Sequence, residues 1–131
     1  MSLLLDTHVF LWWIDGKPIP APISAAIRNP LNAVWLSAAS VWEIAIKASI
    51  GKLRLPGPAV DFVEEQRQRN RLGWLPIEPV ALKQLESLPF LHRAPFDRLL
   101  IAQALAHDYE LASSDGVFAQ YPVKLCWQPP R

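Results

Sequence analysis

Residues 2–16 read Ser-Leu-Leu-Leu-Asp-Thr-His-Val-Phe-Leu-Trp-Trp-Ile-Asp-Gly. The apolar run at residues 2–5 stops at Asp6, which predicts a strand buried on both faces, as in a parallel sheet. Residues 7–15 then predict a helix that ends at Gly16. Apolar side chains fall on every side of this helix, so we expect it to be deeply buried or covered by a partner chain.

The rest of the chain repeats this alternation of strand and helix. Further strands are predicted at residues 33–36, 74–77, 109–113 and 123–126. Helices are predicted at residues 24–29, 38–50, 59–72, 80–88 and 96–107, with a helical turn at 117–120. The 13 prolines lie between these elements, and the Pro-Pro-Arg tail at 129–131 is expected to be loose. The alternation predicts an α/β fold, a three-layer α/β/α sandwich around a mostly parallel sheet of four to five strands.

Length and composition narrow the class of protein. The 131 residues predict one domain over residues 1–131, and a hydrophobic content of 51% with 19% charged residues is typical of a globular core. A formal net charge of +1 excludes a global field for nucleic acid or an anionic membrane. The single cysteine, Cys126, excludes a disulfide framework and a multi-Cys zinc site. Asp6 interrupts the only early apolar run, and no run reaches the ~18 residues of a membrane span, so we expect a cytoplasmic protein without a membrane partner.

Four carboxylates are placed by this topology near one edge of the sheet. Asp6 follows the first strand, and Asp115 comes shortly after the strand at 109–113. Asp97 lies in the first turn of the helix that leads into that strand, and Glu43 lies one to two turns into the helix after the second strand. Because ligands bind outside the carboxyl ends of parallel strands, we expect these acids to converge there without a fixed cationic partner.

Each acid also has a simple structural explanation. Asp6 and Asp97 could cap helices, and Asp115 could start a turn with the glycine that follows it. Glu43 could close a capping box with Ser40 or pair with a lysine four residues later.

Together the four acids favour a metal site. Two unit charges ~5 Å apart at an effective dielectric of ~20 repel by roughly 3 kcal/mol, so a cation is needed to neutralise the cluster. Oxygen ligands without histidine or cysteine suit Mg²⁺ or Mn²⁺. The chemistry that follows is metal-assisted phosphoryl transfer.

Four motifs resemble the PIN-domain family, and within it the VapC-type toxins of bacterial toxin–antitoxin modules. They read Leu-Leu-Leu-Asp-Thr-His at 3–8, Ser-Ala-Ala-Ser-Val-Trp-Glu-Ile-Ala-Ile-Lys at 37–47, Pro-Phe-Asp-Arg-Leu-Leu-Ile-Ala-Gln-Ala at 95–104 and Ser-Ser-Asp at 113–115. The resemblance covers essentially the whole chain in the right order, and the second and third motifs are its specific part.

The resemblance implies a PIN-like fold and a Mg²⁺- or Mn²⁺-dependent endoribonuclease that acts as a toxin. The family's four acidic positions, which are both catalytic and metal-binding, fall on Asp6, Glu43, Asp97 and Asp115. Its hydroxyl positions fall on Thr7 and on Ser113, which we expect at the substrate. The resemblance also implies an RNA substrate, a homodimer and a cognate antitoxin. Some relatives carry a further acid beyond the last position, but residues 116–118 are Gly-Val-Phe, so the likeness does not extend to a full second metal site.

Basic residues near the acidic edge are candidates for phosphate contacts. These are Lys47, Lys52 and Arg98, although Arg98 could instead pair with a carboxylate. The arginines within residues 67–71 are interpreted as a solvated helix face.

Six tryptophans are many for a chain of this length. Trp35, Trp42 and Trp74 are predicted to be core residues. Trp12 and Trp13 cannot easily both face inward, so they are candidates for an interface.

A non-enzymatic alternative is a PIN-like binding or scaffold module whose acidic edge holds a partner's arginine and no metal. Saturable binding of Mg²⁺ or Mn²⁺ would distinguish the enzyme from this alternative.

Overall fold

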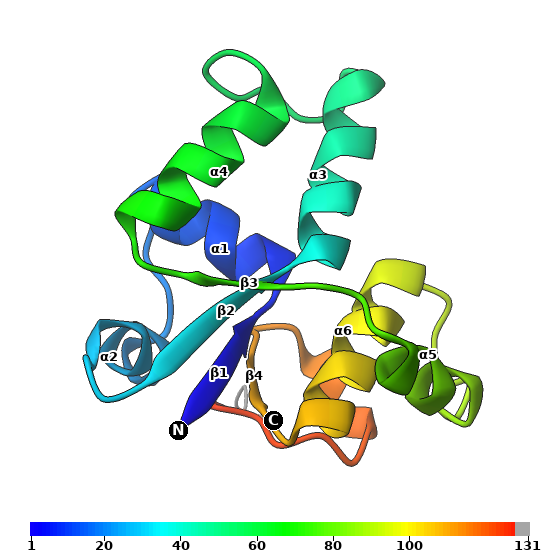
Figure 1. The fold of residues 1–131 in the computed structure, drawn as a ribbon. Helices are drawn as coiled ribbons and strands as arrows, with labels where there is room; N and C mark the ends of the chain where they lie inside the picture. Colours follow the sequence, from blue (N-terminus) through cyan, green and yellow to red (C-terminus); the bar gives the residue numbers. More distant parts are fainter. Residues whose placement is uncertain (128–131) are drawn as a thin grey trace.

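Strand β1 (Ser2–Leu5) lies inside a four-stranded sheet of order β3-β2-β1-β4, in which all neighbours are parallel. It pairs with β2 (Ala33–Ser37) on one side and β4 (Glu110–Ala112) on the other, and β3 (Gly73–Leu75) pairs with β2. This computed structural model describes residues 1–127, so the predicted loose tail lies outside the described residues. The predicted α/β class and the parallel sheet are confirmed (Figure 1).

Helices connect the strands and begin close to their predicted positions. They are α1 (Thr7–Ile14), α2 (Ala21–Arg28), α3 (Ala38–Ser49), α4 (Ala59–Arg69), α5 (Pro79–Glu86) and α6 (Pro95–His107), followed by the 3₁₀ helix η1 (Gly116–Gln120). Helix α2 begins earlier than predicted because Pro22 lies in its first turn, where the missing N–H has no helical partner to lose. Helix α4 ends earlier than predicted, and the chain turns at Arg71, whose φ of 56° is left-handed.

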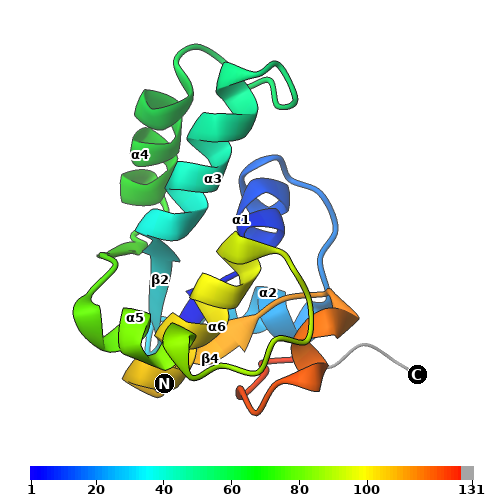
Figure 2. The same ribbon diagram turned by 90° about the vertical axis from the view of Figure 1, so that its right-hand side faces the viewer.

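Alternation along β1 divides the core into two layers. Leu3 and Leu5 pack with buried residues of α1 to α4, whereas Leu4 packs with buried residues of α6 and η1 and with α5. Helices therefore cover both faces of the sheet, which confirms the predicted three-layer sandwich (Figures 1 and 2). Both views show α3 and α4 side by side, projecting past the carboxyl ends of the strands.

The predicted strand at 123–126 is not formed. Its only sheet contact is an isolated parallel bridge between Leu125 and Leu111, made by two backbone hydrogen bonds. All three residues of β4 pair with β1 on its inner edge, but on the outer edge only Leu111 pairs with the 123–126 segment. The sheet of the described chain therefore has four strands.

The prediction that three tryptophans are core residues is wrong for two of them. Trp42 is 55% exposed, because it lies on α3 away from the buried Val41 and Ile44, and its ring meets Phe96 edge-on. Trp74 is 40% exposed on the edge strand β3. Only Trp35 is well packed, with its ring stacked on Tyr109.

No helix within residues 1–127 is both long enough and apolar enough to cross a membrane.

Candidate active site

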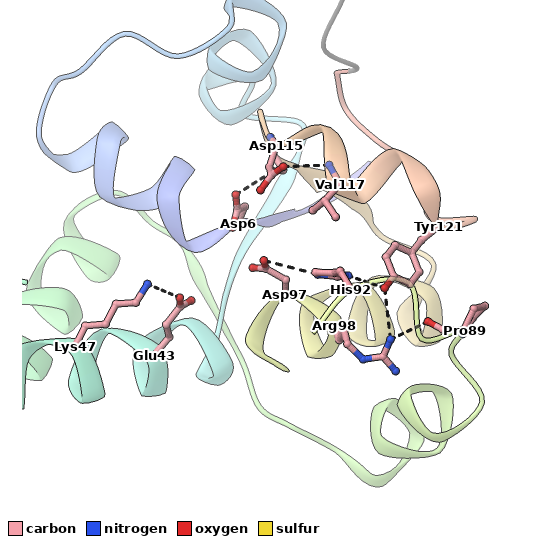
Figure 3. Close-up of polar contacts among 11 residues, drawn as sticks. Asp6, Glu43, Lys47, Pro89, His92, Asp97, Arg98, Asp115, Val117 and Tyr121 are labelled. Atoms are coloured by element: carbon pink, nitrogen blue, oxygen red, sulfur yellow. Dashed lines mark hydrogen bonds and ion pairs between the residues drawn. The ribbon is translucent and has the colours of Figure 1, made fainter. Parts of the chain in front are cut away.

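The four acids predicted to converge come from four separate elements at the carboxyl end of the sheet. Asp6 joins β1 to α1, Asp115 precedes η1, Glu43 lies inside α3 and Asp97 lies in the first turn of α6. In Figure 3, Asp6, Asp97 and Asp115 face a common space, and Glu43 approaches it from α3. The parallel topology explains this placement, because every strand delivers its following residue to the same edge.

Asp6 is a buried acid with one oxygen left without a partner. Asp6 is 2% exposed, and the Ser113 hydroxyl donates a hydrogen bond to Asp6 Oδ2 at 2.9 Å. Its Oδ1 is buried and accepts no hydrogen bond. Burial raises the pKa of Asp6 and the charge of Glu43 adds to this, whereas Ser113 and His8 act in the opposite direction. Although Asp6 precedes α1, its side chain makes no capping hydrogen bond, so the cap explanation is wrong.

The pKa of Asp97 is raised by burial and by the charges of the other three acids. Burial is the largest cause that raises its pKa to about 6, and Asp6, Glu43 and Asp115 each raise it further. The residue at the N-cap of α6 is Ala94, so Asp97 is not the cap of that helix. The charges of the other three acids therefore act on Asp97 in the folded chain.

Glu43 has a cationic partner, which corrects one expectation. Lys47 donates to its Oε2 at 2.7 Å, because a spacing of four residues places both side chains on one face of α3. Its other oxygen, Oε1, is buried without a partner. The capping box with Ser40 is absent, because α3 is capped by Ser37, whose hydroxyl accepts from the N–H of Ala39 at 2.9 Å.

Asp115 shapes the turn into η1. Its Oδ1 accepts from the N–H of Val117 at 3.0 Å, as the turn explanation predicted. Its own N–H donates to the Ser113 hydroxyl at 3.0 Å, and that hydroxyl in turn donates to Asp6. Ser113 is thus buried between two of the acids and connects them, rather than facing solvent where substrate would bind.

The acid cluster suits a hard divalent cation. Two buried carboxylate oxygens, Asp6 Oδ1 and Glu43 Oε1, lack hydrogen-bond donors, and an uncompensated buried carboxylate is costly. All four candidate ligands offer oxygen, the donor type that Mg²⁺ and Mn²⁺ prefer. Within residues 1–127, no three Asp, Glu, His or Cys side chains already lie close enough together to hold one ion. The four acids therefore interact electrostatically, but in the described residues their oxygens are not arranged closely enough to coordinate one ion.

A family model described as the PIN domain matches residues 3–124. The chain belongs to the PIN domain family. Ribonuclease VapC22 of Mycobacterium tuberculosis (strain ATCC 25618 / H37Rv) is 27% identical over 116 residues, which cover 87% of each chain. Ribonuclease VapC16 of the same organism is 42% identical over 45 residues, or 34% of this chain and 32% of that relative.

A solved structure shares the fold of this PIN domain. It is VapBC-5 from Mycobacterium tuberculosis, described as a member of the VapBC family of toxin-antitoxin systems. The TM-score is 0.60 at 16% identity, and the match covers 99% of this chain and 98% of that one. The family resemblance seen in the sequence motifs is confirmed.

The three basic residues predicted as phosphate contacts at the acidic edge of this PIN domain do not lie there together. Lys47 is paired with Glu43, and Lys52 is exposed beyond the end of α3 that lies away from the sheet. Arg98 donates to the carbonyl of Pro89 at 2.7 Å, and its guanidinium also lies over the ring of Phe90. In Figure 3 the Arg98 guanidinium points away from the four acids, because the backbone carbonyls of the preceding loop satisfy it.

Two histidines beside the acids were not recognised as site residues from the sequence. His8 lines a pocket of about 310 Å³ together with Asp6, Trp12, Ser114 and Asp115. His92 Nε2 lies 3.9 Å from Asp97 Oδ2. Burial and the nearby Arg98 lower the pKa of His92. Each histidine lies within five residues of an acid in the sequence, which is the only signal that could have pointed to it.

A hydrogen bond between two buried hydroxyl groups joins α1, which Asp6 precedes, to α3, which contains Glu43. Thr7 Oγ1 donates to Ser40 Oγ at 2.8 Å, and both residues are buried. Thr7, the hydroxyl residue of the first motif, therefore fixes the distance between α1 and α3 instead of facing the pocket.

Proposed function

We propose that this PIN domain is a Mg²⁺- or Mn²⁺-dependent endoribonuclease and the toxin component of a type II toxin–antitoxin system. One observation carries the proposal: two buried carboxylate oxygens at this sheet edge, Asp6 Oδ1 and Glu43 Oε1, have no hydrogen-bond donor, and their charges help to raise the pKa of Asp97. A bound divalent cation would relieve this repulsion and would pair with the two unpartnered oxygens. The names of its relatives VapC22 and VapC16 support ribonuclease activity in particular.

Each acid has a proposed role. Asp6, Asp97 and Asp115 would hold the cation, and Glu43 would complete the ligand set directly or through water. The bound cation supplies a Lewis acid that lowers the pKa of a coordinated water and neutralises charge on the phosphodiester. Ser113 keeps the Asp6 carboxylate oriented with Oδ1 free, since its hydroxyl already occupies Oδ2. Lys47 fixes Glu43 Oε2 and leaves Oε1 for the cation.

Substrate and partners follow from the same proposal. The substrate is RNA, whose phosphates would approach the pocket lined by Asp6, His8 and Asp115. The cognate antitoxin is proposed to cover α1, where Trp12 lines a groove of about 370 Å³ with Leu11 and Phe62. We propose that the protein acts in the cytoplasm, where it would encounter both its RNA substrate and its antitoxin.

A homodimer is proposed through α3. Trp42 and Ile46 of α3 and its C-cap residue Ile50 are exposed and spaced by four residues, so they form one apolar stripe along this segment.

A binding or scaffold module is the second candidate. The Lys47–Glu43 ion pair and the lack of a finished ligand set within residues 1–127 favour it, because they describe an acidic edge that needs no metal.

The deciding experiment measures cleavage of a labelled single-stranded RNA with Mg²⁺, with Mn²⁺ and with a chelator. Asp6→Asn should abolish metal-dependent cleavage, because it removes a buried charged ligand at nearly equal volume. Glu43→Gln should be severe but less complete. Asp61→Asn, which changes an exposed acid on α4, serves as the matched control. Metal-dependent cleavage at the wild-type rate by Asp6→Asn, prepared identically, would refute the assignment.

A further inference from the structure

The ring of His92 lies between Asp97 and a tyrosine at the end of η1. Its Nδ1 is 2.6 Å from the Tyr121 hydroxyl, and its Nε2 is 3.9 Å from Asp97 Oδ2 (Figure 3). The rings of His92 and Tyr121 also meet edge-on, with centroids 5.4 Å apart. His92 belongs to the loop between α5 and α6, so this contact ties that loop to η1.

The hydrogen bonds around Tyr121 suit a His92 ring that accepts at Nδ1 and carries its proton on Nε2. Arg98 Nη1 lies 3.4 Å from the tyrosine hydroxyl, and a guanidinium only donates, so the hydroxyl accepts from Arg98. The hydroxyl proton is then available to donate to His92 Nδ1. When the hydroxyl donates to Nδ1, the proton of the neutral ring sits on Nε2, the nitrogen that faces Asp97.

This Nε2–H is a buried donor without an acceptor. Among the described residues, no partner satisfies it at hydrogen-bond distance. The Tyr121 hydroxyl holds His92 Nδ1 at 2.6 Å, and Arg98, which contacts that hydroxyl, is itself anchored by the carbonyls of Pro89 and Leu88, so the ring is held in this orientation. The nearby carboxylate oxygen is Asp97 Oδ2, at 3.9 Å from His92 Nε2. If the Asp97 carboxylate moved about 1 Å toward the ring, the two atoms would form an ordinary hydrogen bond of ~2.9 Å.

We propose that His92 is a positioning residue for Asp97, and that its Nε2–H holds the Asp97 carboxylate in the orientation that ligates the divalent cation. This inference rests on the proposed metal-dependent function. Tyr121 and Arg98 act on His92 and not on Asp97: Tyr121 contacts Nδ1 of the ring, and Arg98 contacts the Tyr121 hydroxyl, so together they fix the tautomer and the plane of the His92 ring. Hydrogen-bond partners of ligating side chains commonly contribute 10–100-fold to metal affinity.

The test compares two amides that each imitate one ring nitrogen. The Nε2 of glutamine reaches the place of His92 Nε2, whereas the shorter asparagine reaches only the place of Nδ1. We expect His92→Asn to weaken Mn²⁺ binding about tenfold and His92→Gln to stay within about threefold of wild type, measured by titration calorimetry. Tyr121→Phe should fall between them, because its ring loses the group that orients His92. His107→Asn, at the far end of α6, is the matched control and should bind as wild type.

Three outcomes are informative. Wild-type Mn²⁺ affinity in His92→Asn, with affinity lost in Asp97→Asn, would overturn the role of His92 and leave the proposed metal site intact. Wild-type affinity in Asp97→Asn as well would overturn both. Equal weakening in His92→Asn and His92→Gln, together with a lowered metal-free unfolding midpoint, would show a merely structural histidine and also overturn the inference.

Discussion

Replacing Asp97 by asparagine should stabilise the metal-free protein at neutral pH. The folded pKa of about 6 lies above the ordinary value of 3.8, so the folded state penalises the ionised carboxylate. At 1.36 kcal/mol per pKa unit the penalty reaches about 3 kcal/mol, and water at the partly exposed carboxyl reduces it to roughly 1–2 kcal/mol. Because the acid's pKa is raised, the penalty is absent below pH 3.8, grows as pH rises and is complete above about pH 6.

The assay is urea unfolding with a chelator at about pH 4.5 and about pH 7.5, with Asp61→Asn as the control. Asparagine resembles the protonated acid, so the gain in unfolding free energy should be small at the lower pH and about 1–2 kcal/mol at the higher one. Excess Mn²⁺ at a hundredfold over its Kd should stabilise wild type by roughly 2.7 kcal/mol and the variant by clearly less. An unfolding free energy unchanged by the substitution at both pH values would show that the other acids do not destabilise the Asp97 carboxylate. Equal responses to Mn²⁺ would show that Asp97 is not in the metal site.

Three further substitutions test other parts of the molecule. Ser113→Ala should lower the unfolding free energy at neutral pH by about 1–3 kcal/mol, because buried Asp6 loses its donor, and should weaken Mn²⁺ binding; urea unfolding and calorimetry would detect both. Trp12 should become shielded from acrylamide quenching when a partner chain binds, measured as the difference between wild type and Trp12→Phe, and a clean monomer in sedimentation with this indole already shielded would contradict the predicted interface. Cys126→Ser should leave RNA cleavage nearly unchanged, since burial raises the pKa of this lone thiol, and lost activity at unchanged stability would overturn that prediction.

Local sequence patterns determined the order of strands and helices. The apolar run at residues 2–5 and the helical pattern after Asp6 depend on neighbours in the chain, and β1 and α1 form where they were predicted. The parallel arrangement follows from the alternation of elements, and it predicted that Asp6, Asp97 and Asp115 would lie near one edge. The outcome for residues 123–126 was not predictable in this way, because the single bridge to Leu111 depends on where the completed fold places this segment beside β4.

The partners of individual side chains were decided only by the tertiary structure. Sequence spacing allowed Glu43 to pair with Ser40 or with Lys47, and the start of α3 at Ala38 selected the lysine. Ser113 and Asp6 are 107 residues apart, yet one hydrogen bond joins them.

Arg98 and His92 lie close to Asp97 in the sequence, yet only one of them faces it. The carbonyls of the preceding loop hold the Arg98 guanidinium, while Tyr121, 29 residues beyond His92, turns the histidine ring toward the acid. A strand or helix is favoured by short-range periodicity, but the orientation of a polar side chain depends on which donors and acceptors the completed fold brings within 3 Å of it. The sequence therefore determined which acids lie at the same edge of the sheet, and the tertiary structure determined which neighbours orient them.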